Sequence, residues 1–165
     1  MYDNLAFFYI QDSQYAKAIE VGSRALSFFR TAKSPYYLSI VAVNLAHSHL
    51  ELGNLDKAQT HLQEALECEE TQSYPYALRT FGQIQGRQGK WHAAQKSFEQ
   101  ALHFAQQNGD QFAEAYIRRD LGNALLAQSE CDKGQKLLQL ALESFEHLQL
   151  EKEVAETKRQ LGILD

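Results

Sequence analysis

The sequence predicts an all-α fold in which about nine helices form pairs that stack one after another. The first observation behind this prediction is the composition: Leu, Ala, Gln and Glu make up 74 of the 165 residues, whereas Val and Ile supply 10. Unbranched side chains lose little rotamer freedom in a helix, so this composition favours helices over sheets. The chain contains only two prolines, so long helices can run uninterrupted.

The second observation is an internal repeat with a period of about 40 residues. Three columns of small residues recur in one register: Ala6, Ala46, Gly82, Gly122 and Gly162, then Ala18, Ala58, Ala94 and Gly134, then Ala25, Ala65, Ala101 and Ala141. Between the second and third columns lies a larger apolar residue, Leu62, Phe98 or Leu138, with Gly22 in the first repeat. Small residues at fixed places let two helix backbones approach closely. Each column therefore predicts a helix–helix contact.

Each repeat reads as two helices joined by a turn, and the order of elements follows from the register. The predicted units are residues 1–33, 34–72, 73–108 and 109–148, followed by a C-terminal capping helix over 150–164. Turns are predicted at Gly53-Asn54, Gly89-Lys90 and the less regular Ser129-Glu130. Asn108-Gly109-Asp110 reads as a helix stop followed by an N-cap. Ser34-Pro35 has the order of an N-cap and a first helical residue.

Charge and composition exclude several classes of protein. The formal net charge is −5, which disfavours nucleic acid as a direct partner. Every apolar stretch is far shorter than the roughly 20 residues that span a bilayer, so no membrane partner is expected. Cys68 and Cys131 belong to no paired motif, which indicates a reducing compartment and a cytoplasmic location. Phosphate loops and hydrolase motifs are absent from the sequence, so we expect no enzyme activity and no cofactor.

Histidines give no metal site in this interpretation. His47 and His49 are two residues apart, and on a helix such side chains point in different directions. We expect His49 to replace a core aromatic residue and His47 to face the groove formed by the stacked helices.

On these motifs the chain resembles the tetratricopeptide repeat (TPR) family. The stretches from Leu5 to Ala18 and from Leu45 to Ala58 look very like its helix–turn–helix signature. The long repeat is similar to that of kinesin light chains, GoLoco-binding polarity adaptors and bacterial regulators. The resemblance implies a single domain over 1–165, wound as a right-handed superhelix of antiparallel helix pairs with a concave groove for a protein partner.

A column of arginines marks the candidate site. Arg79, Arg119 and Arg159 each lie three residues before a glycine of the first column, and the resemblance implies that this column faces the groove. The predicted peptide-binding residues are Tyr76, Arg79, Gln83, Tyr116, Arg119, Asn123, Arg159, Asn44 and His47. Arginine binds carboxylates and amides pair with a peptide backbone, so an acidic or mixed peptide is expected.

One alternative is that each arginine pairs with an acid inside the fold, for which Asp120, Glu114 and Glu156 are available to Arg119. A second alternative concerns the ligand: some family members bind the free C-terminal carboxylate of a partner with a clamp of basic residues and asparagines. Asn44 resembles one clamp asparagine, but Asp3 and Tyr76 stand where basic residues are expected, so that ligand class is rejected.

Three functions remain open at this stage. The first is a non-catalytic scaffold for protein–protein interaction. The second is the peptide-sensing region of a larger bacterial signalling or transcription regulator, since both ends of the chain read as cut. The third is a self-associating module, a homo-oligomer formed through the hydrophobic C-terminal end at Leu161, Ile163 and Leu164.

Overall fold

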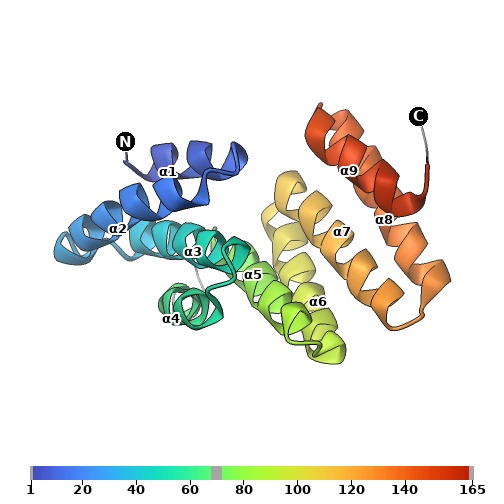
Figure 1. Cartoon of the computed structure of the whole chain (residues 1–165), viewed down its shortest axis with the longest axis horizontal. Helices are drawn as coiled ribbons and strands as arrows, with labels where there is room; N and C mark the ends of the chain where they lie inside the picture. The colour runs from blue at the N-terminus through green and yellow to red at the C-terminus, as the bar shows by residue number, and fades with distance from the viewer. Residues whose placement is uncertain (1, 68–71, 164–165) are drawn as a thin grey trace. The chain divides into compact units, whose positions relative to one another are not determined.

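The computed structural model describes residues 2–67 and 72–163, with side chains from residue 5 onward. Within these residues every regular element is an α-helix, which confirms the predicted all-α fold (Figure 1). The contacts divide the chain into two compact units, Met1–Ile84 and Gln85–Asp165, and the division falls inside one helix. Each unit is described in turn.

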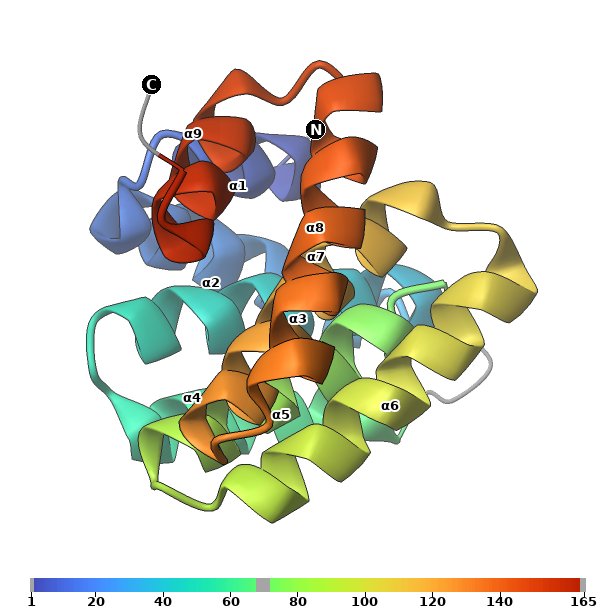
Figure 2. The same ribbon diagram turned by 90° about the vertical axis from the view of Figure 1, so that its right-hand side faces the viewer.

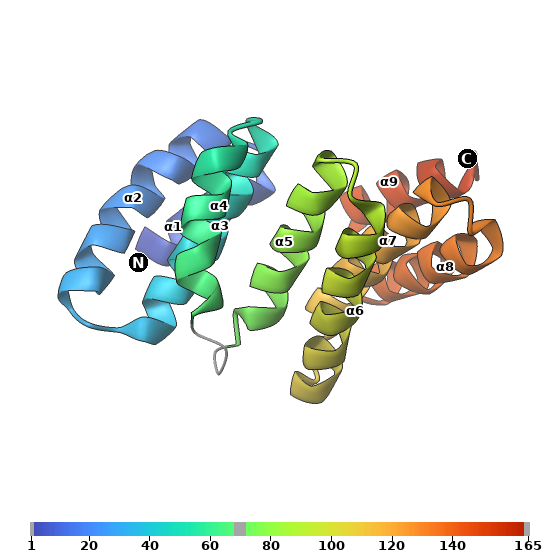
Figure 3. The same ribbon diagram turned by 90° about the horizontal axis from the view of Figure 1, so that it is seen from below.

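Among its described residues, the first unit contains four helices and most of a fifth. Their bounds are α1 (Tyr2–Gln11), α2 (Tyr15–Thr31), α3 (Pro35–Glu51), α4 (Leu55–Leu66) and α5 (Tyr74–Arg87). Helix α2 packs against both α1 and α3, and α3 also packs against α4. Figure 3 shows α2, α3 and α4 as neighbours in this unit. The core is formed by buried alanines and branched residues, among them Ala46, Ala58 and Leu62.

The second unit contains α6 (Trp91–Asn108), α7 (Gln111–Ala127), α8 (Cys131–His147) and α9 (Glu151–Leu161). Each helix packs against the next one along the chain. In Figure 2, α8 faces the viewer and runs up to the turn that leads into α9. A buried cluster of Ala115, Ala141 and Phe145 joins α7 to α8, and Val154 of α9 packs against it.

The small-residue columns lie at helix–helix contacts, as predicted, with one exception. Ala18, Ala58 and Ala94 are each at most 2% exposed, and the column at Ala25 to Ala141 is equally buried. Gly162 is the exception, because it is exposed and ends α9 in the left-handed conformation, with φ 71°. The prediction of a helix–helix contact at Gly162 is therefore wrong. A glycine just past the last turn closes the helix instead.

Two positions that depart from the repeat pattern have a steric reason. A Cβ atom built on Gly22 would lie 2.9 Å from Cδ2 of Leu45, so the α3 leucine fills the space that a larger residue takes in the other repeats. Gly134 stands where alanine was expected. A Cβ there would lie 2.9 Å from the carbonyl oxygen of Gly122 and 2.8 Å from Leu126. The backbones of α7 and α8 therefore touch at this point.

The turns inside the helix pairs share one backbone conformation. Gly53 and Gly89 have φ of 77° and 73°, and Ser13 and Ser129 adopt the same left-handed region at 58° and 64°. The fourth turn is thus as regular as the others, contrary to the expectation from its missing glycine. The predicted stop and cap are confirmed, because Gly109 ends α6 at φ 65° and the Asp110 carboxylate accepts from the Ala113 amide at 2.9 Å. Ser34 is the N-cap of α3, although its hydroxyl makes no capping bond.

Replacing Ser129 with glycine is expected to stabilise the fold. A left-handed conformation costs an ordinary residue about 1–2 kcal/mol, and the greater freedom of glycine in the unfolded chain offsets part of the gain. We expect Ser129→Gly to raise the free energy of unfolding by about 0.5–1 kcal/mol in urea titrations. Gly89→Ser, at the matching turn of the same unit, should lower it. Equal effects of the two substitutions would contradict this interpretation.

Replacing Gly134 with alanine is expected to destabilise the α7–α8 contact. Alanine favours a helix over glycine, but the backbone oxygen of Gly122 cannot move aside, so overpacking dominates. We expect a loss of about 1–2 kcal/mol on chemical unfolding. Gln135→Ala, at the exposed neighbouring position of α8, serves as control and should change stability by less than about 0.5 kcal/mol.

Candidate functional site

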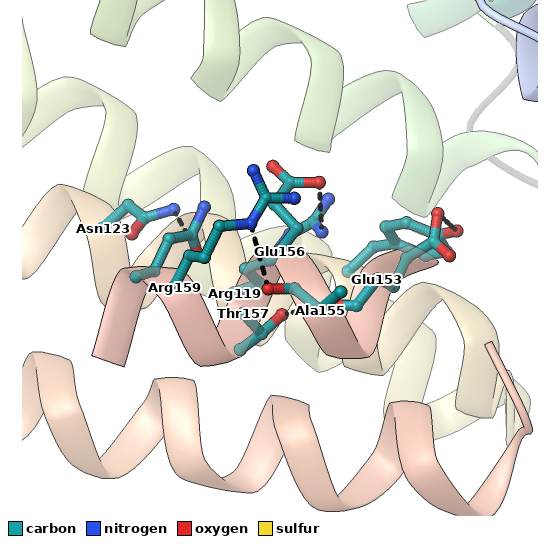
Figure 4. A network of polar contacts seen from close by, with 9 residues as sticks. Arg119, Asn123, Glu153, Ala155, Glu156, Thr157 and Arg159 are labelled. Atoms are coloured by element: carbon teal, nitrogen blue, oxygen red, sulfur yellow. Dashed lines mark hydrogen bonds and ion pairs between the residues drawn. The ribbon is translucent and has the colours of Figure 1, made fainter. Parts of the chain in front are cut away.

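Side chains of α7 and α9 form a polar ladder in the second unit. The Tyr116 hydroxyl donates to Oε1 of Glu153 at 3.0 Å, and Nη1 of Arg119 donates to Oε2 of Glu156 at 3.2 Å. Nδ2 of Asn123 then donates to Oε1 of Gln160 at 3.5 Å. Each rung joins residues 37 apart in the sequence. The ladder thus follows one face of each helix, at positions i, i+3 and i+7. Figure 4 shows these contacts above α9.

Arg119 is held in place by two aromatic rings. Its Cζ lies 5.3 Å from the ring centroid of Tyr116 and 5.3 Å from that of Phe145, which is fully buried. The two rings themselves meet edge to face, with centroids 5.1 Å apart. Only 10% of the Arg119 side chain is exposed. Cation–π contacts of this kind attract the guanidinium to the ring faces, so the charge sits at a fixed place on α7.

Arg159 carries a second positive charge near the ladder. It lies one helical turn after Glu156 on α9, so both residues project from one side of that helix. Its Nε donates to the Ala155 carbonyl at 3.2 Å, and the residue is exposed. Figure 4 shows its guanidinium and the Glu156 carboxylate on the same side of α9. The ladder and Arg159 together place amides, a tyrosine and two guanidinium groups on one face.

The remaining predicted site residues belong to the first unit. Asn44 and His47 are half-buried on α3, and the His47 ring meets Tyr15 edge to face with centroids 6.2 Å apart. Tyr76, Arg79 and Gln83 are half-buried on one face of α5. Arg79 and Arg119 thus lie in different units, and the continuous column of three arginines stays a prediction. The Asp3 side chain and Leu164 lie outside the part of the chain that the structure describes.

Sequence reasoning named one ladder partner and missed the others. Glu156 was among the three acids considered for Arg119, and it is the one that pairs. Glu114 instead binds Arg118 on a different face of α7. Glu153, Gln160 and Phe145 were not named. The repeat could have pointed to the first two, because the ladder joins residues 37 apart, which is one helical turn less than the 40-residue spacing of equivalent positions in this part of the chain.

His49 of α3 stacks against His61 of α4, and the first ring is buried whereas the second is half-buried. His49 is 7% exposed, as expected for a residue in a core aromatic position. Its ring stacks on His61 with centroids 5.5 Å apart and an interplanar angle of 8°. Burial lowers the pKa of His49, and the nearby His61 and Lys57 lower it further. Burial also lowers the pKa of His61; Glu64 opposes this shift, whereas Arg30 and Lys57 add to it. Both rings are therefore favoured in the neutral form.

Comparisons with known proteins identify the family. The tetratricopeptide repeat family model matches residues 1–71 and 38–107. More than half of the chain is covered, so the protein belongs to the tetratricopeptide repeat family. No protein with a curated description matches it.

Solved structures agree on the fold. The repeats of a candidate kinesin light chain from Podosopora anserina, described as nearly identical TPR-like repeats, align with a TM-score of 0.65 and 16% identity. The alignment covers 98% of this chain and 85% of that one. A single-substitution variant of the same repeats aligns with a TM-score of 0.64, the same identity and the same coverage. At this level of identity the likeness concerns the fold alone.

The family and the described helices set the broad class of function. TPR repeats generally mediate protein–protein interactions and scaffolding, and the fold is a non-catalytic one. None of the helices that the structure describes is long and apolar enough to cross a membrane.

The histidine pair predicts how stability depends on pH. Both folded-state pKa values lie below the ordinary value of 6.5, so below that pH the unfolded chain binds protons that the folded pair does not. The free energy of unfolding should therefore fall as pH drops from about 7 towards 5. Replacing both residues, as His49→Phe with His61→Gln, should flatten this dependence in urea titrations. His92→Gln, at an exposed position, is the control, and an equal flattening there would contradict the assignment.

Proposed function

We propose that this protein is a scaffold that binds a segment of a partner protein along the first helices of its repeats, in the predicted concave groove. The interaction class follows from the family, and the face along which binding occurs is the proposal. In the second unit the face consists of Tyr116, Arg119, Asn123 and Arg159. In the first unit it consists of Asn44 and His47 on α3 and of Tyr76, Arg79 and Gln83 on α5. The whole chain acts as one repeat domain, with α9 as its capping helix.

The observation that carries the proposal is the chemistry of the α7–α9 face. Its side chains offer fixed positive charge, amide groups and an aromatic surface, which are the groups that recognise an extended peptide with acidic side chains. The rings that hold Arg119 reduce the entropy that its side chain would lose on binding. Tyr116 and Arg119 rest on the buried cluster around Phe145. The core therefore supports this face, and the polar groups of the face are the ones that a partner would meet.

A cytoplasmic location and an acidic partner complete the proposal. Cys131 is an exposed free thiol, which suits a reducing compartment, and Cys68 lies outside the described residues. The formal net charge of −5 disfavours an acidic partner over most of the surface, so the arginines would direct such a segment to this face.

Reversing the charge of Arg159 tests the proposal. The purified full chain is screened against a degenerate array of short peptides, and the best binder is titrated by fluorescence anisotropy. Arg159→Glu should lower the affinity for that peptide by about tenfold or more, because an acidic peptide attracted by arginine is repelled by glutamate. Lys136→Glu carries the same charge change at an exposed position of α8 and should leave the affinity within about twofold.

The two outcomes of this titration are distinct. Selective loss in Arg159→Glu, with unchanged helicity by circular dichroism, would support binding at this face. Equal affinities for wild type, Arg159→Glu and Lys136→Glu would overturn it.

Self-association through the C-terminal end is the second candidate, and the exposure of Ile163 favours it. The side chain is 44% exposed, whereas Leu161 is half-buried. Sedimentation of the wild type and of Ile163→Lys at increasing concentration would distinguish the two functions. An oligomer that dissociates in Ile163→Lys would support self-association, and a monomer at high concentration would exclude it.

A further inference from the structure

Arg119 has more hydrogen-bonding capacity than the protein uses. A guanidinium carries five N–H donors, and the structure gives Arg119 one hydrogen bond among the described residues, from Nη1 to Glu156. The aromatic contacts with Tyr116 and Phe145 fix the group but accept no conventional hydrogen bond. A mostly buried charge with one polar contact gains free energy from a further acceptor.

Glu156 is a loosely held counter-ion. Its contact with Arg119 is 3.2 Å long, beyond the 2.7–2.9 Å that is typical of a charge-assisted N–H···O bond. It uses one carboxylate oxygen and one guanidinium nitrogen, so the pair is not bidentate. The Glu156 side chain is 45% exposed. Glu156 is thus accessible to solvent and can turn away, but the mostly buried Arg119 then needs another anion in its place.

The neighbouring ion pair on α7 shows the contrast. Arg118 and Glu114 lie one turn apart on α7, with side chains only 23% and 16% exposed. They satisfy one another on the helix surface and contact neither Arg159 nor the ladder in any described interaction. Arg118–Glu114 is therefore a closed pair, whereas Arg119–Glu156 is open to solvent on the carboxylate side.

We propose that Arg119 and Arg159 form a receptor for a carboxylate side chain of the partner, and that Glu156 is the internal counter-ion which this carboxylate replaces. The inference rests on the proposed function, since it concerns the same face. It names the chemical group of the partner that binds there and the residue, Glu156, that competes with it. Arg159 supplies the second cation, because its Nε is tied to the Ala155 carbonyl and its two terminal nitrogens have no partner among the described residues. Glu156 thereby selects against neutral segments, which cannot compensate Arg119 for its loss.

Neutralising Glu156 tests the receptor. The probe is a fluorescein-labelled peptide, Ala-Glu-Ala-Ala-Glu-Ala with blocked ends, and its copy with glutamine in place of both glutamates. Glu156→Gln should bind the glutamate peptide roughly fivefold more tightly than wild type does, because the competing carboxylate is gone. The glutamine peptide should bind Glu156→Gln no more tightly than it binds wild type. The Nε–Hε resonances of Arg119 and Arg159 should shift only with the glutamate peptide.

Glu114→Gln is the matched control. It removes the counter-ion of Arg118 on the same helix, and it should leave the affinity for both peptides unchanged. Thermal unfolding by circular dichroism confirms that each variant is folded. Glu156→Asp provides a second test, because its shorter side chain keeps the charge but withdraws it from Arg119. Its affinity for the glutamate peptide should lie between those of wild type and Glu156→Gln.

The failures of the two proposals are distinguishable. If Glu156→Gln and Glu156→Asp bind the glutamate peptide no better than wild type, the receptor is overturned. The proposed function then still stands if Arg159→Glu weakens the array-selected peptide. An equal gain in Glu114→Gln would also overturn the receptor, because it would show a general effect of net charge.

Discussion

The close contact between the backbones of α7 and α8 is the constraint on which the second unit depends. Gly122 and Gly134 face one another, and a Cβ atom on Gly122 would lie 3.0 Å from the carbonyl oxygen of Gly134, whereas one on Gly134 would lie 2.9 Å from that of Gly122. Further along the same interface, Phe145 of α8 clusters with Ala115 and Ala141 and contacts Tyr116 and Arg119 of α7. Small residues between the two helices thus leave room for the ring that supports the candidate site residues. In the first unit the space beside Gly22 is filled by the Leu45 side chain instead.

The position of α9 follows from this packing. Together with α7, this helix forms the candidate face. Val154 packs against the cluster around Phe145, and Thr157 is the one residue that α9 buries fully among its described side chains. Three hydrogen bonds from Tyr116, Arg119 and Asn123 of α7 add to this packing. The residues that orient α9 are therefore also the residues that a partner would meet. Under the proposed function, partner binding and docking of the last helix would use one set of side chains, and Glu156 would be the point at which the two compete.

The sequence predicted the helix pairs well because their contacts repeat at a constant period. Asp110 and Gly109 were recognised from local chemistry, since capping depends on neighbouring backbone groups. Gly162 was misassigned because a glycine can serve either a close contact or a helix end, and the register alone does not distinguish these uses. The choice of Glu156 over Asp120 and Glu114 as the partner of Arg119 required tertiary geometry, because the three acids are equally compatible with the sequence. Ser129 kept a left-handed turn that its residue type disfavours, since the flanking helices impose it.

The central claim is that a partner segment binds on the α7–α9 face, and chemical-shift mapping tests it most directly. Backbone and side-chain resonances of the isotope-labelled full chain would be followed while an array-selected peptide is added. The account predicts that the largest shifts of the second unit fall at Tyr116, Arg119, Asn123 and Arg159, with small shifts at Arg118 and His147. Shifts centred on Arg118 and His147, with the ladder residues unchanged, would contradict it.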